Sequence, residues 1–159
     1  MKLKIVGSSR SELLVKLLAY SAIYGLIHVN YIDLVASGSN IPGYHLWLIA
    51  LYFAPFIPIL FILGFDDWEL LVSMGLTASL MNDLFYHPIG MILFDRKVDL
   101  LDWYLFQLGF RGLEARWSLN LGFTAIPVSS ILMGASIYMR LAITTMLLVK
   151  WWRENKSER

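Results

Sequence analysis

The sequence predicts an all-α fold: an integral membrane four-helix bundle with one interfacial or re-entrant helical segment at residues 95–117. Composition is the first observation behind it, because 58% of the 159 residues are hydrophobic and only 16% are charged. Soluble domains are about 45–50% apolar and about 25% charged. Secondly, the apolar residues form several stretches of the length, about 20 residues, that a bilayer crossing needs. Thirdly, the chain has no cysteine, which excludes a disulfide scaffold and thiolate metal sites.

Four spans are expected within a single transmembrane domain over residues 1–159, at about residues 13–36, 44–64, 68–94 and 120–149. An uncharged turn rich in Gly, Ser and Asn separates the first two. The second contains Pro55 and Pro58, which predict a kink near its middle because proline removes a backbone donor. An acidic turn precedes the third, where the helix dipole favours carboxylates.

The segment at residues 95–117 differs in character from the spans beside it. It carries four acidic and four basic residues among large apolar side chains: Asp95, Asp99, Asp102 and Glu114, with Arg96, Lys97, Arg111 and Arg116. This mixture is typical of an amphipathic helix that lies in the membrane interface, or of a re-entrant hairpin broken at Gly109. Both arrangements stay open at this point.

The last apolar stretch, residues 118–149, is too long for one crossing, since it would extend about 48 Å as a helix. Pro127 and Gly134 are candidate breaks. Either one long tilted helix protrudes from the bilayer, or a shorter leading segment precedes the crossing. We favour a crossing that ends at residues 150–153, where a lysine, two tryptophans and an arginine form an interface anchor.

Basic residues gather near both ends of the chain: Lys2, Lys4, Arg10 and Lys16 at one, and Lys150, Arg153, Lys156 and Arg159 at the other. The positive-inside rule therefore predicts a multi-pass protein of the cell membrane with both termini in the cytoplasm, and an even number of spans agrees. The net charge of +1 and the lack of a basic patch indicate no nucleic-acid partner. The expected partner is the lipid bilayer.

Ionisable side chains inside apolar spans are costly and mark candidate functional positions. In the third span Asp83 and His87 are four residues apart, which places them on one helix face. With the N-terminus inside, these two residues, His28 and Asp33 of the first span, and His45 of the second all fall in the outer half of the bilayer. The sequence therefore predicts a polar site near the outer leaflet.

Three chemistries fit this predicted site. Asp83 and His87 can ligate one divalent transition metal, with His28 or His45 completing a zinc, copper or iron site. An Asp–His pair in a low dielectric can instead act catalytically, by relaying or abstracting a proton. Thirdly, His28 and His87 can be the axial ligands of a haem b, in a pocket to which Tyr24 contributes. Against all three stands a structural role, in which the Asp–His pair only bonds a partner helix.

Arg140 completes the set of candidate residues. If the last crossing covers about residues 130–149, Arg140 lies near mid-bilayer and needs an acid such as Asp83 as its partner. If the crossing lies earlier in the chain, Arg140 is only an interface anchor. In the first case it could also bind an anionic headgroup or a carboxylate substrate. We group Arg140 with Asp33 and Asn82 as candidate substrate or charge partners.

From these observations we expect a small polytopic membrane protein with an intramembrane His/Asp polar site near the outer leaflet. The favoured function is a metal-linked enzyme or a metal-binding subunit. The alternatives are a non-catalytic subunit of a larger membrane complex, for example a respiratory one, a b-type haem protein, and a proton or ion carrier. No reaction or substrate is specified, because the chain contains no zinc-protease, P-loop, nucleophile-elbow or lipidation motif.

Overall fold

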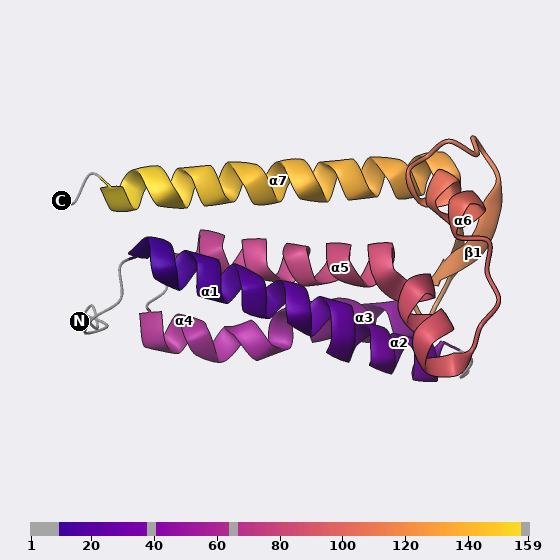
Figure 1. The fold of residues 1–159 in the computed structure, drawn as a ribbon, viewed down its shortest axis with the longest axis horizontal. Coiled ribbons are helices and arrows are strands. Elements are labelled where there is room, and N and C mark those ends of the chain that lie inside the picture. The colour runs from indigo at the N-terminus through magenta and orange to yellow at the C-terminus, as the bar shows by residue number, and fades with distance from the viewer. Residues whose placement is uncertain (1–9, 38–40, 64–66, 157–159) are drawn as a thin grey trace.

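The structure, a computed structural model, describes residues 10–37, 41–63 and 67–156. In chain order its elements are α1 (Arg10–Ile23), the π-helical η1 (Tyr24–Val29), α2 (Asn30–Ala36), α3 (Tyr44–Phe53), the 3-10 turn η2 (Ala54–Phe56), α4 (Ile57–Leu63), α5 (Trp68–Phe94), α6 (Leu100–Gln107), β1 (Ala115–Asn120), β2 (Ala125–Ser129) and α7 (Ser130–Lys156). The long helices run alongside one another, and α6 and the β1–β2 hairpin gather at one end (Figure 1). We call this the hairpin end, and the opposite end, where α1 begins and α7 ends, the terminal end.

Within the described residues, three helical stretches are long and apolar enough to cross a membrane: Glu12–Ala36, Tyr44–Ile62 and Ser130–Glu154. These confirm the apolar character expected for the first, second and last spans. The third expected span is a continuous helix over the predicted residues, 68–94, but it is not among the three. A four-span bundle is therefore not established by length and composition alone.

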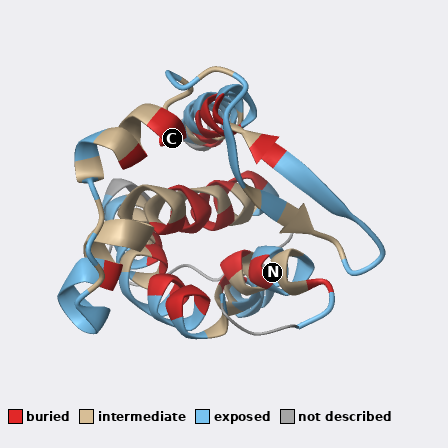
Figure 2. Cartoon of the chain, turned by 90° about the vertical axis from the view of Figure 1, so that its right-hand side faces the viewer, coloured by how far each residue is buried: buried red, intermediate tan, exposed pale blue. Residues whose placement is uncertain are grey.

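Helix α5 is less apolar because it occupies the centre of the molecule. It contacts each of the other helices, and its small and polar residues are buried. Figure 2 shows buried residues on the sides of the helices that face inward and exposed residues outside. Large apolar side chains cover that exterior, among them Trp47, Phe61 and Met146, each at least 70% exposed. A water-soluble protein rarely exposes so much apolar surface.

Two interruptions in the first two helical rods have local causes. The 3-10 turn η2 contains Pro55 and falls where the proline pair predicted a kink. The π-helical turn η1 precedes Asn30, whose Nδ2 donates to the carbonyl oxygens of Gly25 (3.1 Å) and Leu26 (3.0 Å). The Asn30 side chain thus adds a second donor at the Gly25 carbonyl oxygen, which also accepts from the Asn30 backbone N–H, and so supports the widened turn.

The described part of the chain is mostly helical, as expected, but the two strands β1 and β2 make it other than all-α, and the expected helical segment does not continue through residue 117. Only α6 is helical there, capped by Asp99, whose Oδ1 accepts from the Asp102 amide at 3.1 Å. Gly109 and Gly112 adopt positive φ angles of 91° and 62° and turn the chain out of the helix. The chain then forms the antiparallel β1–β2 hairpin, in which residues 116–119 alternate between more and less exposed positions as in a half-buried strand.

The hairpin also decides between the two arrangements considered for residues 118–149. A leading segment, strand β2, precedes the long apolar helix α7, so the expected start of this span at residue 120 is wrong and the helix begins at Ser130. The Ser130 hydroxyl donates to the Phe106 carbonyl oxygen at 2.7 Å and fixes this start against α6. Gly134 lets α7 approach the chain at Gly109, since a methyl group at Gly134 would lie 2.8 Å from Gly109 atoms. At its other end the helix continues past the expected anchor to Lys156.

Candidate functional site

A cavity of about 860 Å³ lies at the hairpin end, between α2, α3, α5, α6, α7 and β1. It is lined by five of the residues singled out from the sequence, namely Asp33, His45, Asp83, His87 and Arg140. Apolar side chains such as Leu48, Phe53 and Met133 line other parts of its wall. Of the five residues expected to share the outer half of the bilayer, four therefore line one cavity, and His28 does not.

An ion pair joins α5 to α7 along one wall of the cavity. Arg140 Nη2 lies 2.5 Å from Asp83 Oδ2, and Arg140 Nη1 donates to Ser79 Oγ at 3.0 Å. The two ionic side chains are mostly buried, with 16% of Arg140 and 21% of Asp83 exposed. This is the partnership expected for an Arg140 placed inside the last crossing. It also means that Asp83 pairs with an arginine.

A second polar group, formed by uncharged partners around Asp33, joins α2, α3 and α5. Asn82 Nδ2 donates to Asp33 Oδ2 at 3.1 Å and to Asn30 Oδ1 at 3.0 Å, and its Oδ1 accepts from Tyr52 Oη at 2.7 Å. Tyr44 also donates to the Asp33 carboxylate. Asn82 is 1% exposed, so each of its hydrogen bonds replaces one that water would make. Asn82 and Asp33, which were grouped from the sequence as candidate substrate or charge partners, are thus hydrogen-bonded to each other.

His45 attaches the hairpin to α3. Its Nδ1 accepts a hydrogen bond from the Asn120 amide at 2.8 Å, and its ring stacks on Trp117 with 5.4 Å between centroids. Near the hairpin tip the chain at Gly122 also passes against Gly43. Strand β1 is thereby held over the cavity as one of its walls. His45 was singled out as a metal ligand, and here its Nδ1 lone pair is already occupied.

His87 packs against α6 at the wall of the cavity. Its ring contacts the Trp103 ring edge-on, with centroids 4.0 Å apart. One turn further along α6, Gln107 Nε2 donates to the Asp83 carbonyl oxygen at 3.2 Å. Three buried polar atoms of these neighbouring side chains have no hydrogen-bond partner: His87 Nδ1, Trp103 Nε1 and Gln107 Oε1.

The structure does not bring His28 and Tyr24 to this site. The His28 side chain is exposed and stacks on Tyr24, with 5.7 Å between centroids, while Tyr24 Oη donates to the Leu51 carbonyl oxygen at 3.0 Å. Neither residue lines the cavity. Among the described residues no group of three or more His, Asp or Glu side chains could hold a metal ion, so the predicted metal centre has no support. His28 and His87 likewise do not face each other as axial haem ligands would.

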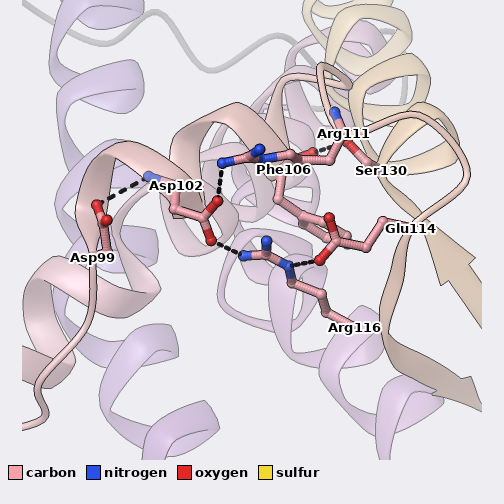
Figure 3. A network of polar contacts seen from close by, with 7 residues as sticks. All are labelled: Asp99, Asp102, Phe106, Arg111, Glu114, Arg116 and Ser130. Atoms are coloured by element: carbon pink, nitrogen blue, oxygen red, sulfur yellow. Dashed lines mark hydrogen bonds and ion pairs between the residues drawn. The ribbon is translucent and has the colours of Figure 1, made fainter.

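A charged network beside the cavity connects α6 to the hairpin (Figure 3). Asp102 pairs with Arg111 and, at 2.6 Å, with Arg116, which also contacts Glu114 at 2.8 Å. The hydrogen bond from Arg116 holds the pKa of Asp102 below its ordinary value, and the same bond raises the pKa of Arg116. The Arg116 guanidinium also lies over the Phe106 ring, 5.0 Å from its centroid.

Sequence reasoning missed Trp103, Gln107 and Trp117 as residues of the site. All three belong to the segment at residues 95–117, which was expected to be an interfacial or re-entrant helical segment. The available signal was the spacing of Trp103 and Gln107, which are four residues apart and therefore share one face of a helix. Nothing in the sequence indicated that this face turns toward His87.

Comparison with known proteins adds no further constraint. No family model, curated protein or solved structure matches this chain. Fold and site therefore have to be interpreted from the residues themselves.

Proposed function

We propose that this chain is a small multi-pass membrane protein that binds an amphipathic organic molecule in the cavity at its hairpin end. The observation that carries the proposal is the cavity itself, at about 860 Å³, whose walls carry both charged and apolar side chains. Ligand sites are typically cavities of about 300–1,000 Å³ with a few placed polar groups among apolar ones. An occupant with a polar headgroup and an apolar body matches both kinds of side chain.

The proposed topology has the four crossings expected from the sequence, including α5, which is less apolar than the other three. The rod α3–α4 ends at the terminal end and α7 begins at the hairpin end (Figure 1). If the three apolar stretches cross the bilayer, the chain has to return between them, and α5, 27 residues long, is the connection. A helix of that length extends about 40 Å, enough for the hydrocarbon core. The start of α1 and the end of α7 both lie at the terminal end, so the proposal places the terminal end on the cytoplasmic side and the hairpin end on the outer side.

An organic ligand replaces the metal that was favoured from the sequence. The side chains around Asp83 and His87 are committed to other contacts: Asp83 to Arg140, and His45 to Asn120. Apolar side chains make up much of the remaining lining, which suits an organic molecule better than a metal ion.

The experiment is analysis of what the purified protein retains. Protein purified in mild detergent is extracted with organic solvent, and the extract is examined by mass spectrometry. The variant Ser136→Trp places an indole in the cavity, because Ser136 lines it. The matched control is Ala135→Trp, on the exposed side of the same helix. The proposal predicts a molecule retained by the wild type and the control and lost from Ser136→Trp. Equal extracts from all three, with nothing above the detergent background, would overturn it.

A further inference from the structure

We infer that the occupant of the cavity is a membrane lipid, which enters sideways from the bilayer between α3 and α7. The inference rests on the proposed function and adds the class of ligand and its route. It starts from the helices on the two sides of the cavity. Helix α3 lines it with Leu48, Ile49 and Phe53, among others, and α7 lines it with Met133 and Ser136. Both helices belong to stretches that are apolar enough to cross a membrane.

Helices α3 and α7 are connected at the back of the cavity and at the hairpin end. Among the described elements, α5 alone packs closely against both of them. At the hairpin end, β2 leads directly into α7, and the Asn120 amide of β1 donates to His45 of α3. Away from α5 and beyond the hairpin, no element in the described part of the chain packs across the space between α3 and α7. This side of the cavity faces the bilayer in the proposed topology.

Ile49 marks the opening, because it belongs both to the cavity lining and to the outer surface of the bundle. It lines the cavity and is 47% exposed. It lies about 8 Å along the helix axis from the start of α3, inside the apolar stretch Tyr44–Ile62. At this depth a crossing helix is surrounded by lipid chains. A molecule that enters beside Ile49 therefore comes from the bilayer.

The two ends of the cavity determine how a lipid lies in it. Phe53 and Leu76 are the lining residues of α3 and α5 that lie farthest from the hairpin end. Phe53 closes this apolar end against α5, since a methyl group at Gly75 would lie 2.2 Å from its ring. At the hairpin end, polar residues of α6 and β1 line the cavity, such as the exposed Ser118. The lipid headgroup thus belongs at the hairpin end, with a hydrocarbon chain beside Phe53 and Leu76.

The test is photolabelling by a lipid that stays in the bilayer. The protein is reconstituted in nanodiscs of phosphatidylcholine, part of which carries a diazirine in its acyl chain, and the labelled residues are mapped by mass spectrometry after irradiation. The reporter is Leu76, which lies on the central helix α5 and is reached through the cavity. Met146, 70% exposed on α7, is the reference for ordinary contact with lipid. We expect the lipid to label both residues.

Two variants locate the route. Ile49→Trp narrows the opening, and Leu46→Trp makes a similar change at an exposed residue of α3 that does not line the cavity. Ile49→Trp should reduce the label at Leu76, relative to that at Met146, severalfold, while Leu46→Trp and Ile49→Ala keep the wild-type ratio. An equal ratio in Ile49→Trp and Leu46→Trp would overturn the route past Ile49.

A water-soluble alcohol with a short diazirine-bearing chain separates this inference from the proposed function. If this alcohol labels Leu76 and the bilayer lipid does not, the ligand enters from water, which overturns the inference and leaves the proposed function standing. If neither probe labels Leu76, the inference is overturned as well. The solvent extracts of the wild type and Ser136→Trp then decide the proposed function independently.

Discussion

Asp83 and Arg140 form an ion pair inside the bundle, and each side chain is mostly buried. Their mutual contact replaces the hydration that each charge would have in water. Removing one partner leaves the other charge buried without compensation, which costs more than the pair itself contributes. We predict that Asp83→Ala and Arg140→Ala each lower the free energy of unfolding by about 3 kcal/mol. The double variant should lose much less than the sum of the two. Reversible unfolding in mixed detergent and SDS measures all three.

The control for this double-mutant cycle is the ion pair between Lys16 and Glu12 on α1. Its side chains are largely exposed, Lys16 at 65% and Glu12 at 49%. Glu12→Gln should change the free energy of unfolding by less than about 1 kcal/mol. Strict additivity of the Asp83 and Arg140 substitutions would show that the two charges do not interact.

The Tyr52 hydroxyl gives a second prediction at the residue scale. It donates to Asn82 Oδ1 at 2.7 Å, and both residues are buried. Tyr52→Phe removes one donor with little change in volume, and we expect it to cost about 1 kcal/mol. Tyr31→Phe, at a side chain that is 52% exposed, is the matched control and should be neutral in the same unfolding assay. An equal loss of unfolding free energy in Tyr52→Phe and Tyr31→Phe would argue that the hydrogen bond to Asn82 contributes no stability of its own.

Residues of the site differ in how far the sequence could predict them. The Asp83–Arg140 partnership was predictable, because a buried arginine requires an acid and few acids occur inside the apolar stretches. His28 was wrongly assigned to the site. Its position in the sequence shows how deep along the first span it lies, but not which face of the helix packs inward. The roles of Trp103 and Gln107 depend on how α6 folds back on α5, which a local pattern does not encode.

Among the elements, the crossing of η1 and α5 depends on close backbone approach. A methyl group at Gly25 would lie 2.2 Å from the Ala78 carbonyl oxygen. Gly25→Val should therefore force the two helices apart and cost about 1–3 kcal/mol by overpacking. Ala142→Val, on an exposed part of α7, should be nearly neutral and controls for the effect of a branched side chain in a helix. Unfolding of Gly25→Val at the wild-type midpoint would contradict the close crossing.

The hairpin provides a pH prediction at the same scale. Because Arg116 lowers the pKa of Asp102 from its ordinary value of 3.8, the attachment of β1 to α6 contributes stability above that value. It loses this contribution as the pH falls through the lowered pKa. The hairpin should therefore keep its position from pH 7 to about pH 5 and loosen only below about pH 4.

Spin labels can measure the position of the hairpin, since the chain has no cysteine of its own. Labels at Thr124→Cys and Leu46→Cys report the distance between the hairpin tip and α3. The distance distribution should broaden below about pH 4. Asp102→Asn should broaden it at pH 7, while Glu154→Gln at the terminal end leaves it unchanged. A wild-type distribution that broadens between pH 7 and pH 5 would assign the change to another group.

For the whole molecule, composition predicted the apolar exterior, and hydropathy located three helices that are apolar enough to cross a membrane. Hydropathy could not establish α5 as a crossing. This helix is surrounded by other helices, so its side chains contact protein and do not have to be apolar. The hairpin was missed for a related reason. Its strands are short and follow glycines whose positive φ angles end the helix, and these turns become evident only in three dimensions.

The position of α5 in the bilayer can be decided by labelling single cysteines with a membrane-impermeant maleimide. Asp67 and Lys97 lie just beyond the two ends of α5. If α5 crosses, Asp67→Cys reacts only from the cytoplasmic side, together with Arg153→Cys at the end of α7. Lys97→Cys then reacts only from the outside, together with Phe123→Cys, whose side chain is 85% exposed at the hairpin tip. Ser73→Cys, buried within α5, should react from neither side. Labelling of Asp67→Cys and Lys97→Cys from one side would mean that α5 does not cross, and would place the cavity at a different depth from the one proposed.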